Sequence, residues 1–222
     1  MILKRKEEVS SQTLGEEIAN AITHGLGFIL SIVGFVILLY NCLLKGTVWH
    51  IVSCSIYGGS LLLLYLISTL YHSITHNRAK SVFRRLDHIS IYLLIAGTCI
   101  PLTLVVLKGP LGWTLFGIEC GLCLLGVLFK AIFGPKLSII SSLFYLIMGW
   151  VSIIAFKPII TALSLSGFAW ILLGGIFYSL GIIFFALDKK YKYSHAIWHI
   201  FVLSGSVCHF FLILLYIVPF SV

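Results

Sequence analysis

Charged residues are scarce in this sequence: Asp, Glu, Lys and Arg together make up 10% of its 222 residues. A soluble domain contains about 25% charged residues, so the composition excludes an ordinary soluble globular protein. Hydrophobic residues make up 60% of the chain, and the mean hydropathy is +1.11. This composition is typical of a multi-pass membrane protein, because about 20 apolar residues in a helix span the hydrocarbon core.

A secretory signal peptide is also not expected. Lys4, Arg5 and Lys6 are followed by the polar stretch 7–20 rather than by a short apolar run. The six cysteines lie in or beside apolar runs, where thiols pack as small apolar side chains. We therefore expect no disulfide framework.

Apolar runs separated by short polar breaks predict seven transmembrane helices. Only helices and closed barrels satisfy every backbone polar group in lipid, and these runs have the length of membrane-spanning helices. The fold expected is an all-α seven-helix bundle over 21–218, preceded by a cytoplasmic segment 1–20. The expected helices are 21–44, 51–72, 88–107, 112–133, 137–156, 167–187 and 195–218.

The basic residues predict the orientation of this bundle. Of the 15 Lys and Arg residues, only Lys45, Lys108 and Lys157 fall on the side opposite the N-terminus. Because basic residues favour the cytoplasmic side, we expect a cytoplasmic N-terminus and an external C-terminus. The excess of basic residues then marks contact with lipid headgroups and not with nucleic acid. The residues on the N-terminal side are Lys4, Arg5, Lys6, Arg78, Lys80, Arg84, Arg85, Lys130, Lys136, Lys189, Lys190 and Lys192.

Histidines at the cytoplasmic helix ends form a candidate metal site. His195 and His199 are four residues apart at the start of the seventh expected helix, so they share one face. His72 ends the second expected helix at the same membrane depth. Three histidines with an open fourth position are typical of a catalytic Zn²⁺ site, although interfacial histidines also serve merely as hydrogen-bonding groups.

Two further polar residues are expected at that depth. Asp87 opens the third expected helix, and Ser68 lies one turn before His72. We expect Asp87 to act on a water molecule or to orient a ligand imidazole. Ser68 is expected to bind that water or a developing oxyanion.

A polar stripe enters the first expected helix with Glu16, Asn20, Thr23 and His24. It predicts either helix-start and interhelical hydrogen bonding or direct participation in the site. His50, His76, His88 and His209 are expected to be surface or packing residues. Glu119, in the fourth expected helix, is interpreted as a hydrogen-bonded or water-facing acid, with a metal or proton-relay role as the alternative.

Taken in order, these motifs resemble the haemolysin III family, the bacterial branch of the progestin and adipoQ receptor (PAQR) group. The resemblance covers residues 14–218. It rests on Glu16-x-x-Asn20-x-x-Thr23-His24, Ser68-x-x-Tyr71-His72, Leu86-Asp87-His88, Gly97-Thr98-Cys99-Ile100-Pro101 and the run from His195 to Val202. Cys99–Ile100 stands where a Tyr–Thr pair is expected in the family.

The resemblance implies a zinc ion near the cytoplasmic face, bound by His72, His195 and His199, with Asp87 and Ser68 beside it. It also implies a bacterial plasma-membrane protein whose partners are membrane lipids. The wider superfamily includes metal-dependent hydrolases of lipid amides, so hydrolysis of a lipid amide or ester is the first hypothesis. The alternatives are a receptor or regulator with structural zinc, and a channel-like or haemolytic (cytolytic) protein.

Overall fold

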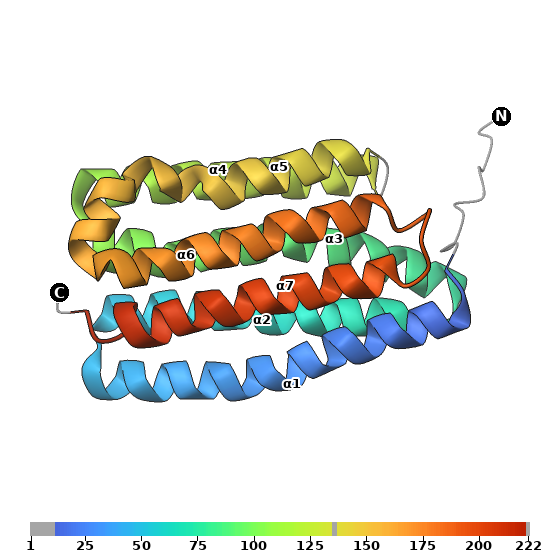
Figure 1. Cartoon of the computed structure of the whole chain (residues 1–222), viewed down its shortest axis with the longest axis horizontal. Helices are drawn as coiled ribbons and strands as arrows, with labels where there is room; N and C mark the ends of the chain where they lie inside the picture. Colours follow the sequence, from blue (N-terminus) through green and yellow to red (C-terminus); the bar gives the residue numbers. More distant parts are fainter. Residues whose placement is uncertain (1–11, 135–136, 221–222) are drawn as a thin grey trace.

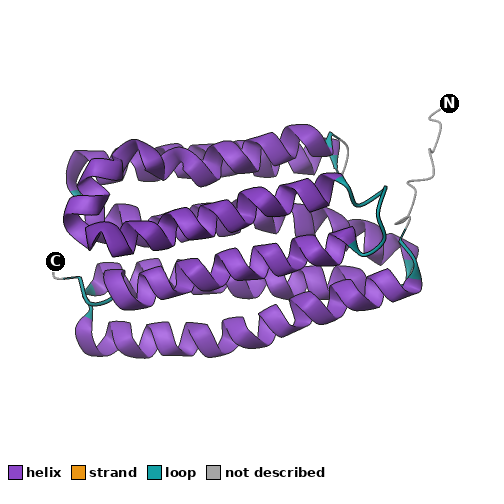
Figure 2. Cartoon of the chain, in the orientation of Figure 1, coloured by secondary structure: helices purple, strands orange, loops and turns teal. Residues whose placement is uncertain are grey.

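The computed structural model describes residues 12–134 and 137–220. Each regular element in these two ranges is a helix (Figure 2). Lys4, Arg5, Lys6 and Lys136, which contribute to the predicted orientation, lie outside the described residues. The elements are α1 (Leu14–Lys45), α2 (Val48–Ser73), α3 (Asn77–Pro101), η1 (Leu102–Leu107), α4 (Gly109–Phe133), α5 (Ser138–Trp150), η2 (Val151–Ala155), α6 (Phe156–Ala186), α7 (Ser194–Leu212) and η3 (Ile213–Ile217).

Several of these helices begin earlier than the hydropathy pattern predicts, and at α1 and α3 a capped polar first turn accounts for the difference. α1 begins at Leu14 instead of residue 21, because the Thr13 hydroxyl accepts from the Glu16 N–H while the Glu16 carboxylate accepts from the Thr13 N–H. α3 begins at Asn77 instead of residue 88, and His76 caps it by accepting from the Ala79 N–H over 3.4 Å. Polar first turns therefore extend both helices beyond their apolar segments.

Six helical stretches among the described residues are long and apolar enough to cross a membrane. The fifth and sixth expected helices fall within one of them, the 48-residue stretch Ile139–Ala186, so a count of seven is not confirmed by length and hydropathy. The stretch is not one straight helix, because Ser164 has φ 65° and ψ 172°. Figure 1 shows that the chain reverses direction between α5 and the labelled part of α6.

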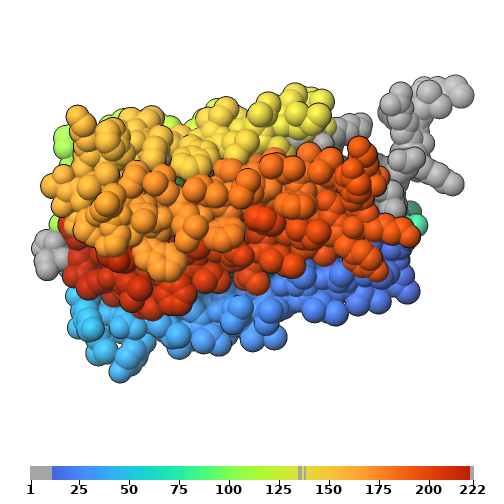
Figure 3. All heavy atoms as spheres, viewed as in Figure 1, coloured from blue at the N-terminus to red at the C-terminus, as the bar shows by residue number. Residues whose placement is uncertain are grey.

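The helices run nearly parallel or antiparallel in a bundle (Figure 1). α1 packs against α2 and α7, α6 packs against α7, and α3 packs against α2 and α4. The space-filling view shows α1, α6 and α7 side by side on one face (Figure 3). Large apolar side chains such as Ile29 and Val33 of α1 are exposed, as expected for surfaces that face lipid acyl chains.

This topology brings chain segments that are distant in sequence to one end of the bundle. The start of α1, the end of α2 and the starts of α3 and α7 all lie at the right-hand end of Figure 1. His72 ends α2 and His195 begins α7, so the arrangement of helices alone places them at one depth.

Candidate metal centre

Three histidines meet at the end of the bundle where α2 finishes and α7 begins. His72, His195 and His199 each offer a ring nitrogen, and these atoms all lie within 4.8 Å of one another. The three side chains are buried, and His199 is completely inaccessible. The sequence-based prediction that these residues come together therefore agrees with the geometry.

Each of the three rings has an oxygen atom near its Nδ1 atom. Nδ1 of His72 lies 2.7 Å from the Glu17 carboxylate, and Nδ1 of His195 lies 3.5 Å from that of Asp188. Nδ1 of His199 lies 3.1 Å from the Thr23 hydroxyl and 3.3 Å from the Asn20 carbonyl oxygen. At His72 and His199 these acceptors favour the tautomer that carries its proton on Nδ1, which directs the lone pair of Nε2 outward. Nδ1 of His195 has no hydrogen-bond partner among the described residues, and the Asp188 carboxylate is only near it.

The Nε2 atoms themselves test whether a metal ion fits. Nε2 of His72, His195 and His199 are all buried and have no hydrogen-bond partner among the described residues. A buried polar atom without a partner is uncommon in a native protein, and three on converging imidazoles are the donor set of a divalent metal ion. These residues therefore fit a metal site.

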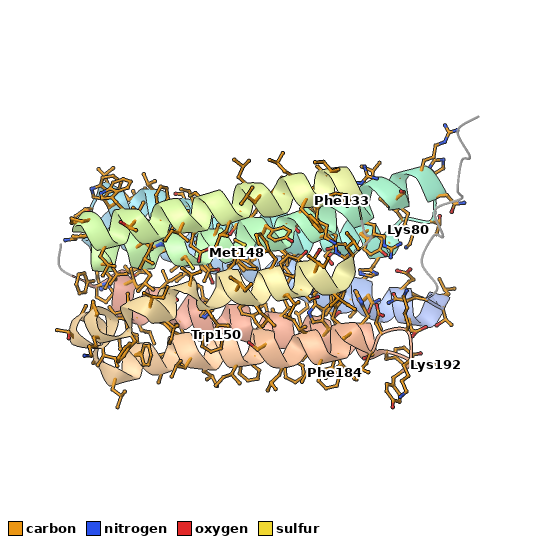
Figure 4. All side chains as sticks on the ribbon, turned by 90° about the horizontal axis from the view of Figure 1, so that it is seen from above. Lys80, Phe133, Met148, Trp150, Phe184 and Lys192 are labelled. Atoms are coloured by element: carbon orange, nitrogen blue, oxygen red, sulfur yellow. The ribbon has the colours of Figure 1, made fainter. Side chains whose placement is uncertain are left out.

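Glu17 is the functional residue that the sequence analysis missed. Its carboxylate joins His72 to Lys80, whose ammonium lies 3.1 Å away, at the start of α3 (Figure 4). Glu16, the acidic residue that the sequence predicts in the polar stripe, caps α1 and accepts from the Tyr193 N–H over 3.1 Å. The available signal was spacing: Glu17, Asn20 and His24 also follow a helical repeat.

The other members of the α1 stripe surround the histidines. The His24 ring stacks on the His199 ring, with centroids 3.4 Å apart. The Asn20 amide lies 3.4 Å from Nδ1 of His72, and Thr23 contacts His199 as described above. Of the two readings of this stripe, close association with the site agrees with the geometry for Asn20, Thr23 and His24, and helix capping agrees for Glu16.

Asp87 and Ser68 form a second polar group beside the histidines. The Ser68 hydroxyl lies 2.7 Å from Nδ1 of His24 and also contacts the Asp87 carboxylate. Asp87 is not among the residues whose ligand atoms lie within 4.8 Å of each other. The geometry therefore suits Asp87 to a role beside a metal ion rather than as one of its ligands.

An elongated, mostly apolar cavity begins at this polar group. His24 and Asp87 line one end, and Cys99 of α3, Leu102 of η1 and Leu212 of α7 line it further along. Asp87 and Leu102 are 15 residues apart on the continuous helical stretch Asn77–Leu107, and at 1.5 Å per residue that is about 22 Å. The cavity thus leads from the polar group deep into the apolar bundle, and Cys99 belongs to its wall.

The remaining histidines lie away from the metal centre. His209 packs beside Gly174 of α6, while His50 contacts the Ile217 carbonyl oxygen at the opposite end of the bundle. His76 caps α3. Glu119 is buried near the Cys99 thiol, and neither of its carboxylate oxygens has a hydrogen-bond partner among the described residues. Its interpretation as a hydrogen-bonded or water-facing acid therefore stays a prediction.

Comparison with known proteins places these features in a family. The profile of the family described as Haemolysin-III related matches residues 12–210. Hemolysin-3 of Bacillus cereus is 50% identical over 209 residues, covering 94% of this chain and 95% of the relative. The Hemolysin-3 homolog of Bacillus subtilis (strain 168) is 51% identical over 206 residues, covering 93% and 96% respectively.

The similarity also extends to a human protein at lower identity. The monocyte to macrophage differentiation factor of Homo sapiens is 29% identical over 217 residues, covering 92% of this chain and 86% of the relative. His72, Asp87, His195 and His199 all lie within the region matched by the family profile. The chain is a multi-pass membrane protein and belongs to the haemolysin III-related family.

Proposed function

We propose that the protein is a zinc-dependent hydrolase of a lipid amide or ester, with its site at the cytoplasmic end of the bundle. The observation that carries the proposal is the convergence of three buried imidazoles whose Nε2 atoms have no partner among the described residues. Asp87 and His24, which lie beside them, line one end of an apolar cavity. Imidazole ligands suit several divalent metals, and zinc is the one that the family resemblance implies. The cavity supplies space for the apolar part of a substrate that reaches the site from the bilayer.

Zinc bound by these histidines would supply a Lewis acid that polarises a carbonyl group and activates water. The carboxylate of Asp87 accepts the proton of the attacking water and delivers it to the leaving amine or alcohol. Ser68 holds Asp87 and stands between it and His24. The single hydroxyl proton of Ser68 is donated to Asp87 in this arrangement, and when Asp87 takes up the proton of the water the hydroxyl is released to donate to the substrate oxygen as negative charge develops.

We further propose seven membrane spans, with the N-terminus in the cytoplasm of a bacterial cell and the C-terminus outside. The reversal at Ser164 supports division of Ile139–Ala186 into two antiparallel spans. The Bacillus relatives support a bacterial plasma membrane as the location. The orientation rests on the distribution of Lys and Arg.

The test measures metal content and lipid turnover on the same detergent-purified preparations. About one zinc per chain is expected in the wild type and in Asp87→Asn, and none in the His195→Ala/His199→Ala double variant. The wild type should hydrolyse a member of a panel of lipid amides and esters, and the double variant should hydrolyse none. Asp87→Asn should lose at least about 100-fold in rate, in line with the contribution of general acid–base groups.

Other results would select the alternative functions. Bound zinc without turnover of any lipid, together with a lower melting temperature in the double variant, would indicate a regulator with structural zinc. Leakage of dye from vesicles that contain the wild type would indicate a channel-like or cytolytic protein. A well-folded wild type without any metal would contradict the proposal, because the proposed hydrolysis depends on the metal.

A further inference from the structure

A second buried polar cluster lies at the same end of the bundle, between α3 and α4. Lys130 occupies the last turn of α4 and has a relative exposure of 0%. Its Nζ atom has no hydrogen-bond partner among the described residues. Lysines near a helix end normally extend the ammonium group to the membrane surface, so a fully enclosed one needs an explanation.

The described acidic residues do not provide that explanation. Glu17 and Asp188 pair with His72 and His195. Asp87 contacts Ser68 and is an electrostatic neighbour of Arg84, not of Lys130. Glu16 caps α1. Glu119 is on the same helix as Lys130 but 11 residues away, which corresponds to about 16 Å. A buried ammonium without an anion is strongly unfavourable, so the site calls for a negative group from outside this set.

The residues around Lys130 add positive charge and hydrogen-bond donors. His88 and Arg84 of α3 are its electrostatic neighbours, and Nδ1 of buried His88 has no partner in the described ranges. The guanidinium of Arg85 lies beside Gly134, where a Cβ would be 3.5 Å from one of its terminal nitrogens. Ammonium, guanidinium and imidazole groups together are the usual partners of a phosphate group.

Contacts around His88 fix the place of this cluster within the fold. The Tyr145 hydroxyl of α5 donates to the His88 carbonyl oxygen over 2.9 Å. The Tyr92 ring, one turn along α3, lies against Gly126 of α4, one turn before Lys130. Phe133, which follows Lys130 by three residues, lies towards the same end of the bundle as Lys80 (Figure 4). The cluster therefore lies where α3, α4 and α5 meet, near the membrane-surface end of the bundle.

We propose that Lys130, His88 and Arg84 bind a phosphate group, supplied either by the headgroup of an anionic phospholipid or by free phosphate. The site is separate from the three-histidine centre and does not depend on hydrolase activity. Its depth at the end of α4 matches the level of lipid headgroups. Binding supplies the counter-charge that the described residues lack and ties the α3–α4–α5 junction together.

Melting temperatures of the delipidated full-length protein test this proposal. The probes are inorganic phosphate, compared with chloride at equal ionic strength, and mixed micelles of dioleoyl phosphatidylglycerol or dioleoyl phosphatidylcholine. At 100 times the dissociation constant, the effective probe should raise the melting temperature of the wild type by about 5 °C or more. Lys130→Met should lose this increase, whereas the control Lys189→Met, which changes an exposed lysine at the same end, should retain it.

The probes distinguish the two sources of phosphate. Stabilisation by inorganic phosphate assigns the site to free phosphate, and stabilisation by phosphatidylglycerol alone assigns it to a lipid headgroup. In the second case, native mass spectrometry should detect phosphatidylglycerol bound to the wild type and lost from Lys130→Met. Lys130→Arg keeps the charge and should retain binding, which separates loss of the ligand from a folding defect. Equal responses of the wild type, Lys130→Met and Lys189→Met to every probe would overturn the proposal.

Discussion

The Glu17 carboxylate and Nδ1 of His72 lie 2.7 Å apart, although the two residues are 55 positions apart in the sequence. The same carboxylate lies 3.1 Å from the Lys80 ammonium. Glu17 therefore links the start of α1 to the end of α2 and the start of α3. Its carboxylate contacts the edge of the His72 imidazole at Nδ1. Such a contact orients a metal ligand and raises its basicity.

Replacement of Glu17 by Gln is expected to weaken zinc binding about 10–100-fold, because His72 loses its charged hydrogen-bond partner. Competition with a chromogenic chelator measures the affinity. Glu16→Ala is the matched control: it should leave zinc affinity unchanged and cost about 1 kcal/mol of stability through the lost helix cap. Equal zinc affinities for Glu17→Gln and the wild type would show that this contact does not tune the site.

Gly126 provides a test of the packing between α3 and α4. A Cβ at this position would overlap a Tyr92 ring carbon, so Gly126→Ala should destabilise the protein by about 1–3 kcal/mol. Gly121 lies on the same helix and a Cβ there meets nothing within 4 Å. Gly121→Ala should be neutral or stabilising by up to about 1 kcal/mol. Thermal unfolding in detergent compares the two, and an equal loss in both would be evidence against this packing.

Ser164 lies at the reversal within Ile139–Ala186 and adopts φ 65°, ψ 172°, a region that only glycine occupies readily. Ser164→Gly should therefore stabilise the protein by about 1 kcal/mol. Both Ser164→Gly and Ser166→Gly remove the 2.8 Å hydrogen bond between the two hydroxyls, but only the first relieves backbone strain. Unfolding measurements should rank Ser164→Gly above Ser166→Gly; the reverse order would contradict the strained turn.

Reporter fusions determine how many times the chain crosses the membrane. With seven spans, alkaline phosphatase fused to the C-terminus should be active outside the cell, and a fusion after Gly134 should be inactive. A fluorescent protein, which folds in the cytoplasm, should give the opposite pattern at the same two positions. An inactive C-terminal phosphatase with a fluorescent C-terminal reporter would indicate an even number of spans.

Residue types and spacing made part of the site predictable. His195 and His199 share a helix face because they are four residues apart, and alternation of the helices placed His72 at their depth. The choice between Glu16 and Glu17 could not be predicted, because both fit a helical stripe with Asn20. Packing of α1 against α2 decides it by turning Glu17 toward His72 and leaving Glu16 to cap the helix.

The bounds of the helices were also predictable only in part from the sequence. Apolar runs predicted the membrane-embedded lengths, but the polar first turns of α1 and α3 depend on caps at Thr13 and His76. Local hydrogen bonds outweigh hydropathy at those ends. The reversal at Ser164 likewise depends on one backbone conformation within a continuously apolar stretch.

By itself, the sequence determined that this chain is helical and membrane-embedded. Its charge is scarce and its apolar runs are long, and in lipid the backbone N–H and C=O groups of such runs form their hydrogen bonds within a helix. It also determined which histidines could share a depth, because helical spacing fixes faces and levels. Only the tertiary structure decided which atoms meet. The rotation and packing of the helices leave the Nε2 atoms of His72, His195 and His199 and the Lys130 ammonium buried without partners among the described residues. The spacing of residues along the sequence does not specify how helices rotate and pack against one another.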